Sequence, residues 1–340
     1  RAAFKDIHLD VENEDNEVTV DIFSSTERQH RALKLSIEVT IPTKFNVDAR
    51  TSGGSLKIGD QEGNVALKTA GGGITTGQVK NGEARLETSG GSIRVAGMMG
   101  GNLDAHTAGG GITVGNATGD VKVRTSGGTI KIGEVGGSTH AETAGGGIRI
   151  VSSANDVWAS TAGGSINIGQ TKGKIEARTA GGQIKIGPAG GEIRAETSGG
   201  GITVRGSGGP VKVRTAGGSI RVNDARGAIS AETAGGSIRA SLVVSDPKID
   251  TECELTTNGG DVTIYLPEDL SATVSAVLRI SRRRDENYKI ISDFPLKIQE
   301  DRTHRITADG DINGGGDEIR LSTHNGNIRI LKLGSEETSK

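Results

Sequence analysis

Basic residues recur at one position of a repeated segment, six residues after a threonine. This basic row consists of Lys57, Arg94, Lys131, Arg149, Lys185, Arg221 and Arg239. Thr or Asn fills the other copies of the position, and no acidic residue occurs there. A line of cations attracts a polyanion, for example a phosphorylated envelope glycan, a lipid headgroup or a nucleic acid. The alternative is a solvated face whose Lys and Arg residues guard against aggregation.

The single tryptophan is a second candidate contact. Trp158 stands three residues before a repeat threonine, in an otherwise mostly polar column that includes His140 and Glu176. An exposed Trp beside His140 could anchor a glycan or a protein partner. Alternatively, the indole packs under the turn around residues 151–154.

The sequence predicts no enzyme activity, no cofactor and no metal. The charges follow the repeat, whereas sugar-cleaving β-helices need a non-repeated cluster of acids or bases. Residues 309–314 match the start of a calcium loop, but Arg320 replaces the glutamate of its twelfth position. The six histidines are dispersed without zinc-motif spacing. Cys253 is expected to be a buried thiol in an apolar column.

These residues are positioned by a repeat in which threonine is followed by Ser-Gly-Gly or Ala-Gly-Gly. The threonines are Thr51, Thr69, Thr88, Thr107, Thr125, Thr143, Thr161, Thr179, Thr197, Thr215 and Thr233. They are spaced by 18, 19 and 19 residues and then by 18 residues each time. A strict short period repeated this often predicts a stack of similar coils.

Each repeat contains two short segments that are apolar at every second position. In residues 175–187 these segments are Ile-Glu-Ala-Arg-Thr and Gln-Ile-Lys-Ile. This period predicts two strands with one buried face each. Large Ile residues on one strand and small Ala residues on the other are expected to face each other in the core. The Gly pair between the strands is expected to supply positive φ angles for a tight turn.

Two topologies fit this pattern. In a parallel solenoid each strand pairs with its equivalent in the next coil, and in an antiparallel meander successive strands pair with each other. Parallel stacking would place Arg178 beside Glu196 and Arg214 beside Glu232, which favours the solenoid. We therefore predict an all-β, single-chain parallel β-solenoid of 18-residue, two-strand coils with β-rich ends.

Three regions are expected along the chain. Residues 1–50 alternate without the glycine turns and are predicted to form an N-terminal β cap, with strands at 7–11, 18–22 and 33–39. Residues 51–245 form the regular solenoid, and residues 246–340 form irregular C-terminal coils and a cap, with coil-like segments around Thr257 and Thr323. Caps are needed because the last coil otherwise exposes unpaired backbone.

The composition agrees with a thin, elongated core. Glycine accounts for 55 residues, whereas Phe, Trp and Tyr together account for seven. The formal net charge of −2 gives no reason to expect a specific nucleic-acid partner. No apolar stretch reaches the roughly 18 residues of a transmembrane segment. The chain starts at Arg1 without a hydrophobic leader, so a targeting peptide is expected to have been removed.

The repeat unit and the C-terminal segments resemble a bacterial adhesin-type domain family of otherwise unknown function. The resemblance covers the chain from about residue 33, and its closing signature comprises residues 257–267, 292–296, 312–316 and 321–330. It implies a β-solenoid in the cell envelope or outside the cell and supplies no catalytic residues. The expected function is a non-enzymatic, adhesin-like surface protein that binds an envelope glycan or polyanion. The alternative is a structural subunit that assembles with itself into filaments or a surface layer.

Overall fold

The structure is a computed structural model in which the chain forms two compact units, residues 1–42 and residues 43–340. It describes residues 7–14, 17–24, 36–243, 249–281, 288–301 and 304–334. These residues form strands, turns and bends, and none of them lies in a helix. The chain is therefore all-β in its described part, as predicted.

The first unit contains one antiparallel hairpin. Its strands are β1 (Ile7–Glu14) and β2 (Glu17–Ser24), and they pair only with each other. The strand predicted at 33–39 is wrong where it is described, because Ser36–Val39 lie outside any strand, and residues 33–35 lie outside the described residues. That the first unit caps the solenoid stays a prediction.

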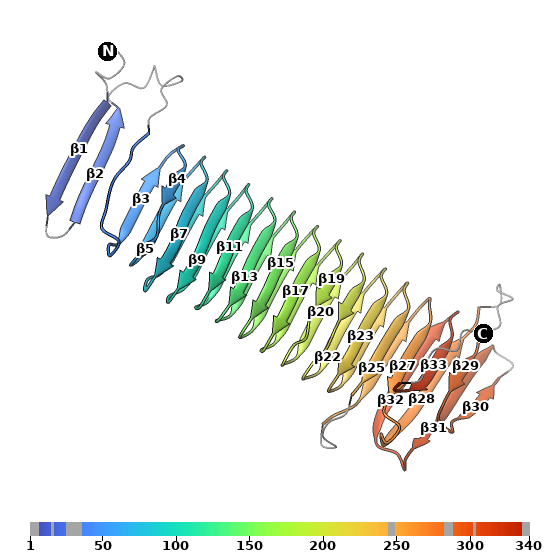
Figure 1. Ribbon diagram of the computed structural model, residues 1–340. Coiled ribbons are helices and arrows are strands. Elements are labelled where there is room, and N and C mark those ends of the chain that lie inside the picture. The colour runs from blue at the N-terminus through green and yellow to red at the C-terminus, as the bar shows by residue number, and fades with distance from the viewer. Residues whose placement is uncertain are drawn as a thin grey trace. The chain divides into compact units, whose positions relative to one another are not determined.

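The second unit is built from two long sheets (Figure 1). The sheet whose strands carry the repeat threonine, here the threonine sheet, has 16 strands. In spatial order they are β3 (Val47–Thr51), β6 (Val65–Thr69), β8 (Ala84–Thr88), β10 (Leu103–Thr107), β12 (Val121–Thr125), β14 (Thr139–Thr143), β16 (Val157–Thr161), β18 (Ile175–Thr179), β20 (Ile193–Thr197), β22 (Val211–Thr215), β24 (Ile229–Thr233), β26 (Cys253–Thr257), β32 (Asp317–His324), β28 (Ala272–Arg279), β31 (Arg305–Ile312) and β30 (Lys297–Glu300).

The other sheet, here the isoleucine sheet, has 15 strands, most of which begin with Ile. From the N-terminal end they are β4 (Leu56–Ile58), β7 (Ile74–Lys80), β9 (Ile93–Met99), β11 (Ile112–Ala117), β13 (Ile130–Val135), β15 (Ile148–Ser153), β17 (Ile166–Thr171), β19 (Ile184–Ile186), β21 (Ile202–Val204), β23 (Ile220–Ala225), β25 (Ile238–Leu242), β27 (Val262–Leu266), β33 (Ile328–Lys332) and β29 (Ile290–Ser292), with β5 (Gln61–Glu62) beside β7.

Equivalent strands of successive coils pair in parallel and in register. Thr161 of β16 pairs with Thr143 of β14 and with Thr179 of β18 in the threonine sheet. Ile166 of β17 pairs likewise with Ile148 and Ile184 in the isoleucine sheet. The parallel β-solenoid is confirmed and the antiparallel meander is wrong. Residues at equivalent positions of successive repeats therefore lie side by side along the stack, with about 4.8 Å between neighbours.

The core lies between the two sheets and follows the predicted columns. Ile166 and Ile184 of the isoleucine sheet are at most 1% exposed, as are Ala159 and Ala177 of the threonine sheet. Full burial of one Ile side chain contributes roughly 1.5–3 kcal/mol relative to leaving it in water. The core is thin but continuous along the stack, because each coil covers its neighbours.

The glycine pair after each threonine serves a different purpose from the one predicted. Neither Gly163 nor Gly164 has a positive φ, and the same holds for their equivalents from Gly53 to Gly236. A Cβ on Gly164 would instead lie closer than 3.0 Å to the carbonyl oxygen of Gly146 in the preceding coil. Close approach of stacked turns therefore requires this glycine, and the expectation of a left-handed turn is wrong.

The stack extends beyond the regular repeat at both ends. β3 already pairs in parallel with β6, so the ladder begins at Val47, before the boundary expected at residue 50. Thr257 and Thr323 continue the threonine row, which confirms the two predicted C-terminal coils. β32 lies between β26 and β28 and pairs with both in parallel, and β31 and β30 then extend the threonine sheet beyond β28 by antiparallel pairing.

Candidate functional site

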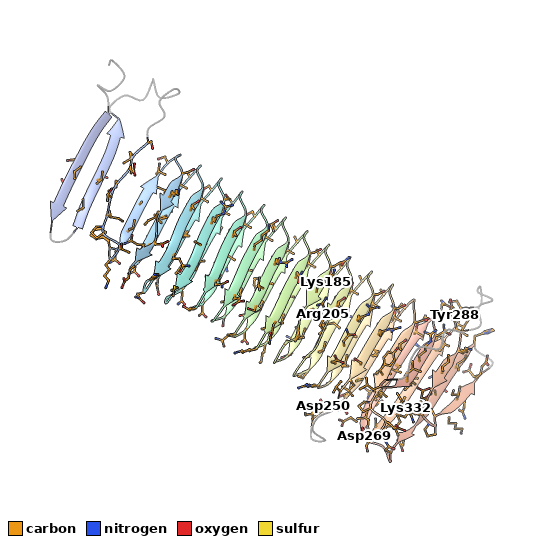
Figure 2. The ribbon with its side chains drawn as sticks, viewed as in Figure 1. Lys185, Arg205, Asp250, Asp269, Tyr288 and Lys332 are labelled. Atoms are coloured by element: carbon orange, nitrogen blue, oxygen red, sulfur yellow. The ribbon has the colours of Figure 1, made fainter. Side chains whose placement is uncertain are left out.

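The basic row lies along the outer face of the isoleucine sheet. Register brings its members together with the intervening Thr and Asn residues, so that Lys131 pairs directly with Arg149 and Arg221 pairs directly with Arg239. Arg239 is half-buried and the other six side chains are exposed. Lys185, which lies on β19, is labelled in Figure 2. The structure therefore places all seven predicted residues in one row.

The row continues further than the sequence analysis found. Thr263 pairs with Arg239, and Arg329 pairs with Thr263. Arg329 stands six residues after Thr323, the same offset as the other members, so the signal was present in the sequence. It was missed because the period slips after residue 240.

Six cations of the basic row differ from the arginines of the threonine sheet in their ion pairing among the described residues. On the threonine sheet, Arg85, Arg124, Arg178, Arg194 and Arg214 each form an ion pair with a glutamate. Among the described residues, no carboxylate forms an ion pair with Lys57, Arg94, Lys131, Arg149, Lys185 or Arg221. The outer face of the threonine sheet thus mixes basic and acidic side chains, whereas the basic row has no acidic residue at its own position.

Ion pairs on the threonine sheet form both across neighbouring coils, as the register predicts, and between residues two positions apart in one coil. Arg124 pairs with Glu142 at 3.2 Å, and Arg214 pairs with Glu232 at 2.7 Å, each across neighbouring coils. The hydrogen bond to Glu232 raises the pKa of Arg214. Arg178 instead pairs with Glu176 of its own strand at 2.7 Å, although Glu196 is its register partner. A pair two residues apart on the same strand face competes with the cross-coil pair.

Trp158 and His140 form an aromatic stack on the outer face of the threonine sheet. They are register partners, and their rings are nearly parallel, with centroids 4.1 Å apart. The ring planes therefore stack along the solenoid axis, and each ring covers one face of the other. A sugar ring that stacks on Trp158 would have to use the remaining indole face. The indole is half-buried and stacks on the His140 ring, and its packing under the turn around residues 151–154 stays a prediction.

A shallow groove of about 950 Å3 runs beside this stack along the first strand residues of the threonine sheet. Its outward lining is of mixed charge and includes Asp104, Lys122 and Glu176 as well as His140 and Trp158. Asn and Asp side chains at its edge accept backbone N–H bonds from the next coil, as Asp120 does from Ser138 at 2.7 Å. These side chains hold the turns together, which explains their presence without a ligand.

His140 is expected to make stability fall at acidic pH. Burial first, and then the nearby Arg124 and Lys122, lower its pKa below the usual 6.5, whereas Glu142 opposes this shift. Its Nε2 is buried with no hydrogen-bond partner among the described residues. Since the unfolded chain binds the proton more readily, folding stability is lost as the pH falls below about 6.5.

The variant His140→Phe tests this pH dependence because phenylalanine can keep the stack without titrating. The urea midpoint should fall less between pH 7.5 and pH 5.0 in this variant than in the wild-type chain. An equal fall in both proteins would assign the acid sensitivity to other groups.

The cysteine and the aspartates of the calcium-like segment, which the sequence analysis also considered, are held by the fold itself. Burial raises the pKa of the Cys253 thiol to about 12, so it stays protonated at neutral pH. Asp309 and Asp311 lie on β31 and accept hydrogen bonds from Ser275 and Thr273. In the part of the chain that the structure describes, no group of three or more His, Cys, Asp or Glu side chains could hold a metal ion. No helix in that part has the length and hydropathy of a membrane span.

The fold and the row define a single-chain parallel β-solenoid with a row of basic side chains on the outer face of one sheet. The chain belongs to the Toastrack DUF4097 family, whose family model matches residues 5–205. The match begins before residue 33 and ends before the segments in residues 257–330 that carry the resemblance noted in the C-terminal sequence. No curated protein and no solved structure matches the chain.

Proposed function

We propose that this chain is a non-enzymatic, adhesin-like binding solenoid that holds a polyanion along the basic row. The observation that carries the proposal is the difference between the two outer faces. Arginines on the threonine sheet are paired with glutamates, whereas six exposed cations of the basic row have no carboxylate partner among the described residues. A charged surface left uncompensated over many coils suits a long ligand of opposite charge.

The spacing of the row supports an extended ligand. Its cations recur every one or two coils, which corresponds to about 5–10 Å. This spacing is close to the Debye length of about 8 Å at physiological salt, so the potentials of neighbouring cations overlap. The chain as a whole has a net charge of −2, so attraction of a polyanion must come from the local row. Because this attraction is electrostatic, polyanion binding must weaken as salt is added. An envelope glycan with phosphate or carboxylate groups has the required charge.

The location in the cell envelope or outside the cell is part of the proposal. It is supported by the resemblance to an adhesin-type family and by the polymers that are found there. The absence of enzyme activity is proposed because the charged residues follow the repeat on both faces. Catalysis would need acids or bases that converge on one reacting bond.

Reversal of two neighbouring cations tests the proposal. The variant Lys131→Glu plus Arg149→Glu should bind long-chain polyphosphate about tenfold more weakly than wild type, a difference of about 1.4 kcal/mol. The reason is that two attractive contacts in adjacent coils become repulsive. The measurement is the dissociation constant by fluorescence anisotropy at 50, 150 and 300 mM salt. Wild-type affinity should fall steadily over that series.

The matched control changes the net charge by the same amount on the outer face of the threonine sheet. Lys174→Glu plus Lys212→Glu reverses the charge of two exposed lysines. Lys174 lies at the edge of the threonine sheet, and Lys212 lies on its outer face. Polyphosphate binding should change less than twofold in this variant. Equal loss in both variants, or no binding by the wild-type chain, would reject the basic row as the binding face.

End-to-end assembly is the second candidate function, and one edge strand favours it. β30 is the last strand of the threonine sheet at its C-terminal end, and all four of its residues are exposed. Ile298 on this strand is 49% exposed. An open edge of this kind can accept a strand from another chain. Filaments of pure protein in negative-stain micrographs, without added ligand, would support assembly over polyanion binding.

A further inference from the structure

A hollow of about 370 Å3 lies on the basic row near its C-terminal end. Three arginines contribute to its lining, namely Arg221, Arg239 and Arg329, together with the hydroxyl-bearing residues Ser219 and Ser237. Asp261 is the one carboxylate residue of the lining. The lining therefore combines three guanidinium groups with one carboxylate.

Protein contacts hold two of the arginines in place. Arg329 donates to Asp261 Oδ2 at 2.7 Å, and this carboxylate also accepts from the Asn327 backbone N–H at 2.8 Å. The Arg239 guanidinium lies over the Tyr265 ring, with its Cζ 5.7 Å from the ring centroid. Such contacts restrict the arginine side chains before any ligand arrives, which lowers the entropic cost of binding.

Arg221 and Arg239 occupy equivalent positions in neighbouring coils. They are register partners, so their backbones lie about 4.8 Å apart. No described carboxylate forms an ion pair with Arg221. Arg221 and Arg239 therefore present two guanidinium groups side by side, and a doubly charged oxyanion between them can accept hydrogen bonds from both.

The two serines complete the arrangement with hydroxyl groups of fixed position. Ser219 Oγ accepts the Ser237 backbone N–H at 3.2 Å, and Ser237 Oγ accepts the Asp261 backbone N–H at 3.1 Å. Within the described residues neither hydroxyl donates to a protein acceptor, so each can donate its proton to a ligand. The other adjacent pair of cations, Lys131 and Arg149, has Thr129 and Gly147 at the equivalent positions and lacks this pair of serines.

We propose that this hollow is a phosphate-binding subsite, with Arg221 and Arg239 as charged ligands and Ser219 and Ser237 as hydroxyl donors. Arginine suits this role because its planar fork can donate two hydrogen bonds to a phosphate. A tetrahedral oxyanion offers enough oxygens for two guanidinium groups and two hydroxyls together. This inference rests on the proposed function, since it names the point of the basic row at which one phosphate group of the polyanion is held.

Inorganic phosphate is the probe, because it contains the recognised group without the polymer. The variant Arg221→Gln plus Arg239→Gln should weaken phosphate binding at least tenfold, measured by phosphorus NMR titration. The matched variant Lys131→Gln plus Arg149→Gln removes the same charge from the same row and should change phosphate binding less than twofold. Both variants should weaken polyphosphate binding, because both lie on the row.

A third variant separates the contribution of the serine hydroxyls to phosphate binding from that of the arginine charges. Ser219→Ala plus Ser237→Ala should weaken inorganic phosphate about threefold to tenfold and leave the salt dependence of polyphosphate binding unchanged. Circular dichroism should confirm that each variant keeps the wild-type strand content. Vesicles of phosphatidylcholine with phosphatidic acid, compared with polyphosphate, then show whether the phosphate group belongs to a lipid headgroup or a soluble polymer.

Different outcomes overturn this inference and the proposed function. If the wild-type chain binds polyphosphate but not inorganic phosphate, or if Arg221→Gln plus Arg239→Gln binds phosphate normally, the subsite is wrong and the basic row stands. If neither probe binds to the wild-type chain, both proposals fail.

Discussion

The substitution Gly164→Ala is expected to destabilise the solenoid by about 3 kcal/mol or more, whereas Gly163→Ala should cost less than about 1 kcal/mol. The two glycines are neighbours in one turn, and neither has a positive φ. Their difference is therefore expected to come from packing between coils and not from backbone conformation.

The reason lies in where a methyl group would point. At Gly164 the added carbon would lie closer than 3.0 Å to the carbonyl carbon and oxygen of Gly146, which are backbone atoms of the preceding coil. At Gly163 the nearest atom would be the Gly145 oxygen at 3.3 Å, so a shift of a few tenths of an ångström suffices. The coils can relieve the first clash only by separating, which stretches the parallel ladder on both sides.

Urea denaturation followed by circular dichroism measures this difference, with the midpoint as the readout because repeat arrays need not unfold in two states. Gly163→Ala serves as the matched control, since it adds the same group to the same turn. Equal midpoints for the two variants would contradict the packing explanation. The same contrast is expected at Gly145 and Gly146, because the coils from Gly71 to Gly236 repeat this geometry.

The role of this glycine shows what the sequence could and could not predict about the fold. The 18-residue period and the alternation predicted strands of a repeated coil, and the opposite charges at Arg214 and Glu232 favoured parallel, in-register stacking over the antiparallel meander. A recurrent glycine, however, fits either a positive φ or a close approach of backbones. Only the positions of neighbouring coils decide between these two causes.

The candidate site was predictable to a similar degree. The offset from each threonine placed Lys131 and Arg149 in one row, and parallel stacking confirmed this. The ion-pair partner of each arginine was only partly predictable, because it depends on side-chain rotamers and on competing neighbours: Arg214 pairs with Glu232 as predicted, whereas Arg178 pairs with Glu176. The stack of His140 on Trp158 was also not predicted, since alternation gives the face of a residue but not the tilt of its ring.

The repeat threonines are the second feature with a large expected effect on stability. Thr161 is 4% exposed, and its hydroxyl joins two turns. Its Oγ1 donates to the Gly146 carbonyl of the preceding coil at 2.8 Å and accepts the Gly164 backbone N–H at 3.2 Å. The same pair of hydrogen bonds recurs in neighbouring coils, for example at Thr179. Each threonine thereby satisfies one donor and one acceptor at a crowded corner.

Thr161→Val should therefore destabilise the chain by about 2 kcal/mol, because it leaves the Gly164 N–H and the Gly146 carbonyl without their partner. Thr161→Ser should cost only about 1 kcal/mol, since serine keeps the hydroxyl and loses one buried methyl group. Urea midpoints measured on the same preparation compare the two variants. If valine proved as stable as serine, the threonine row would contribute through its methyl groups in the core, and the hydroxyl ladder would not be what joins the coils.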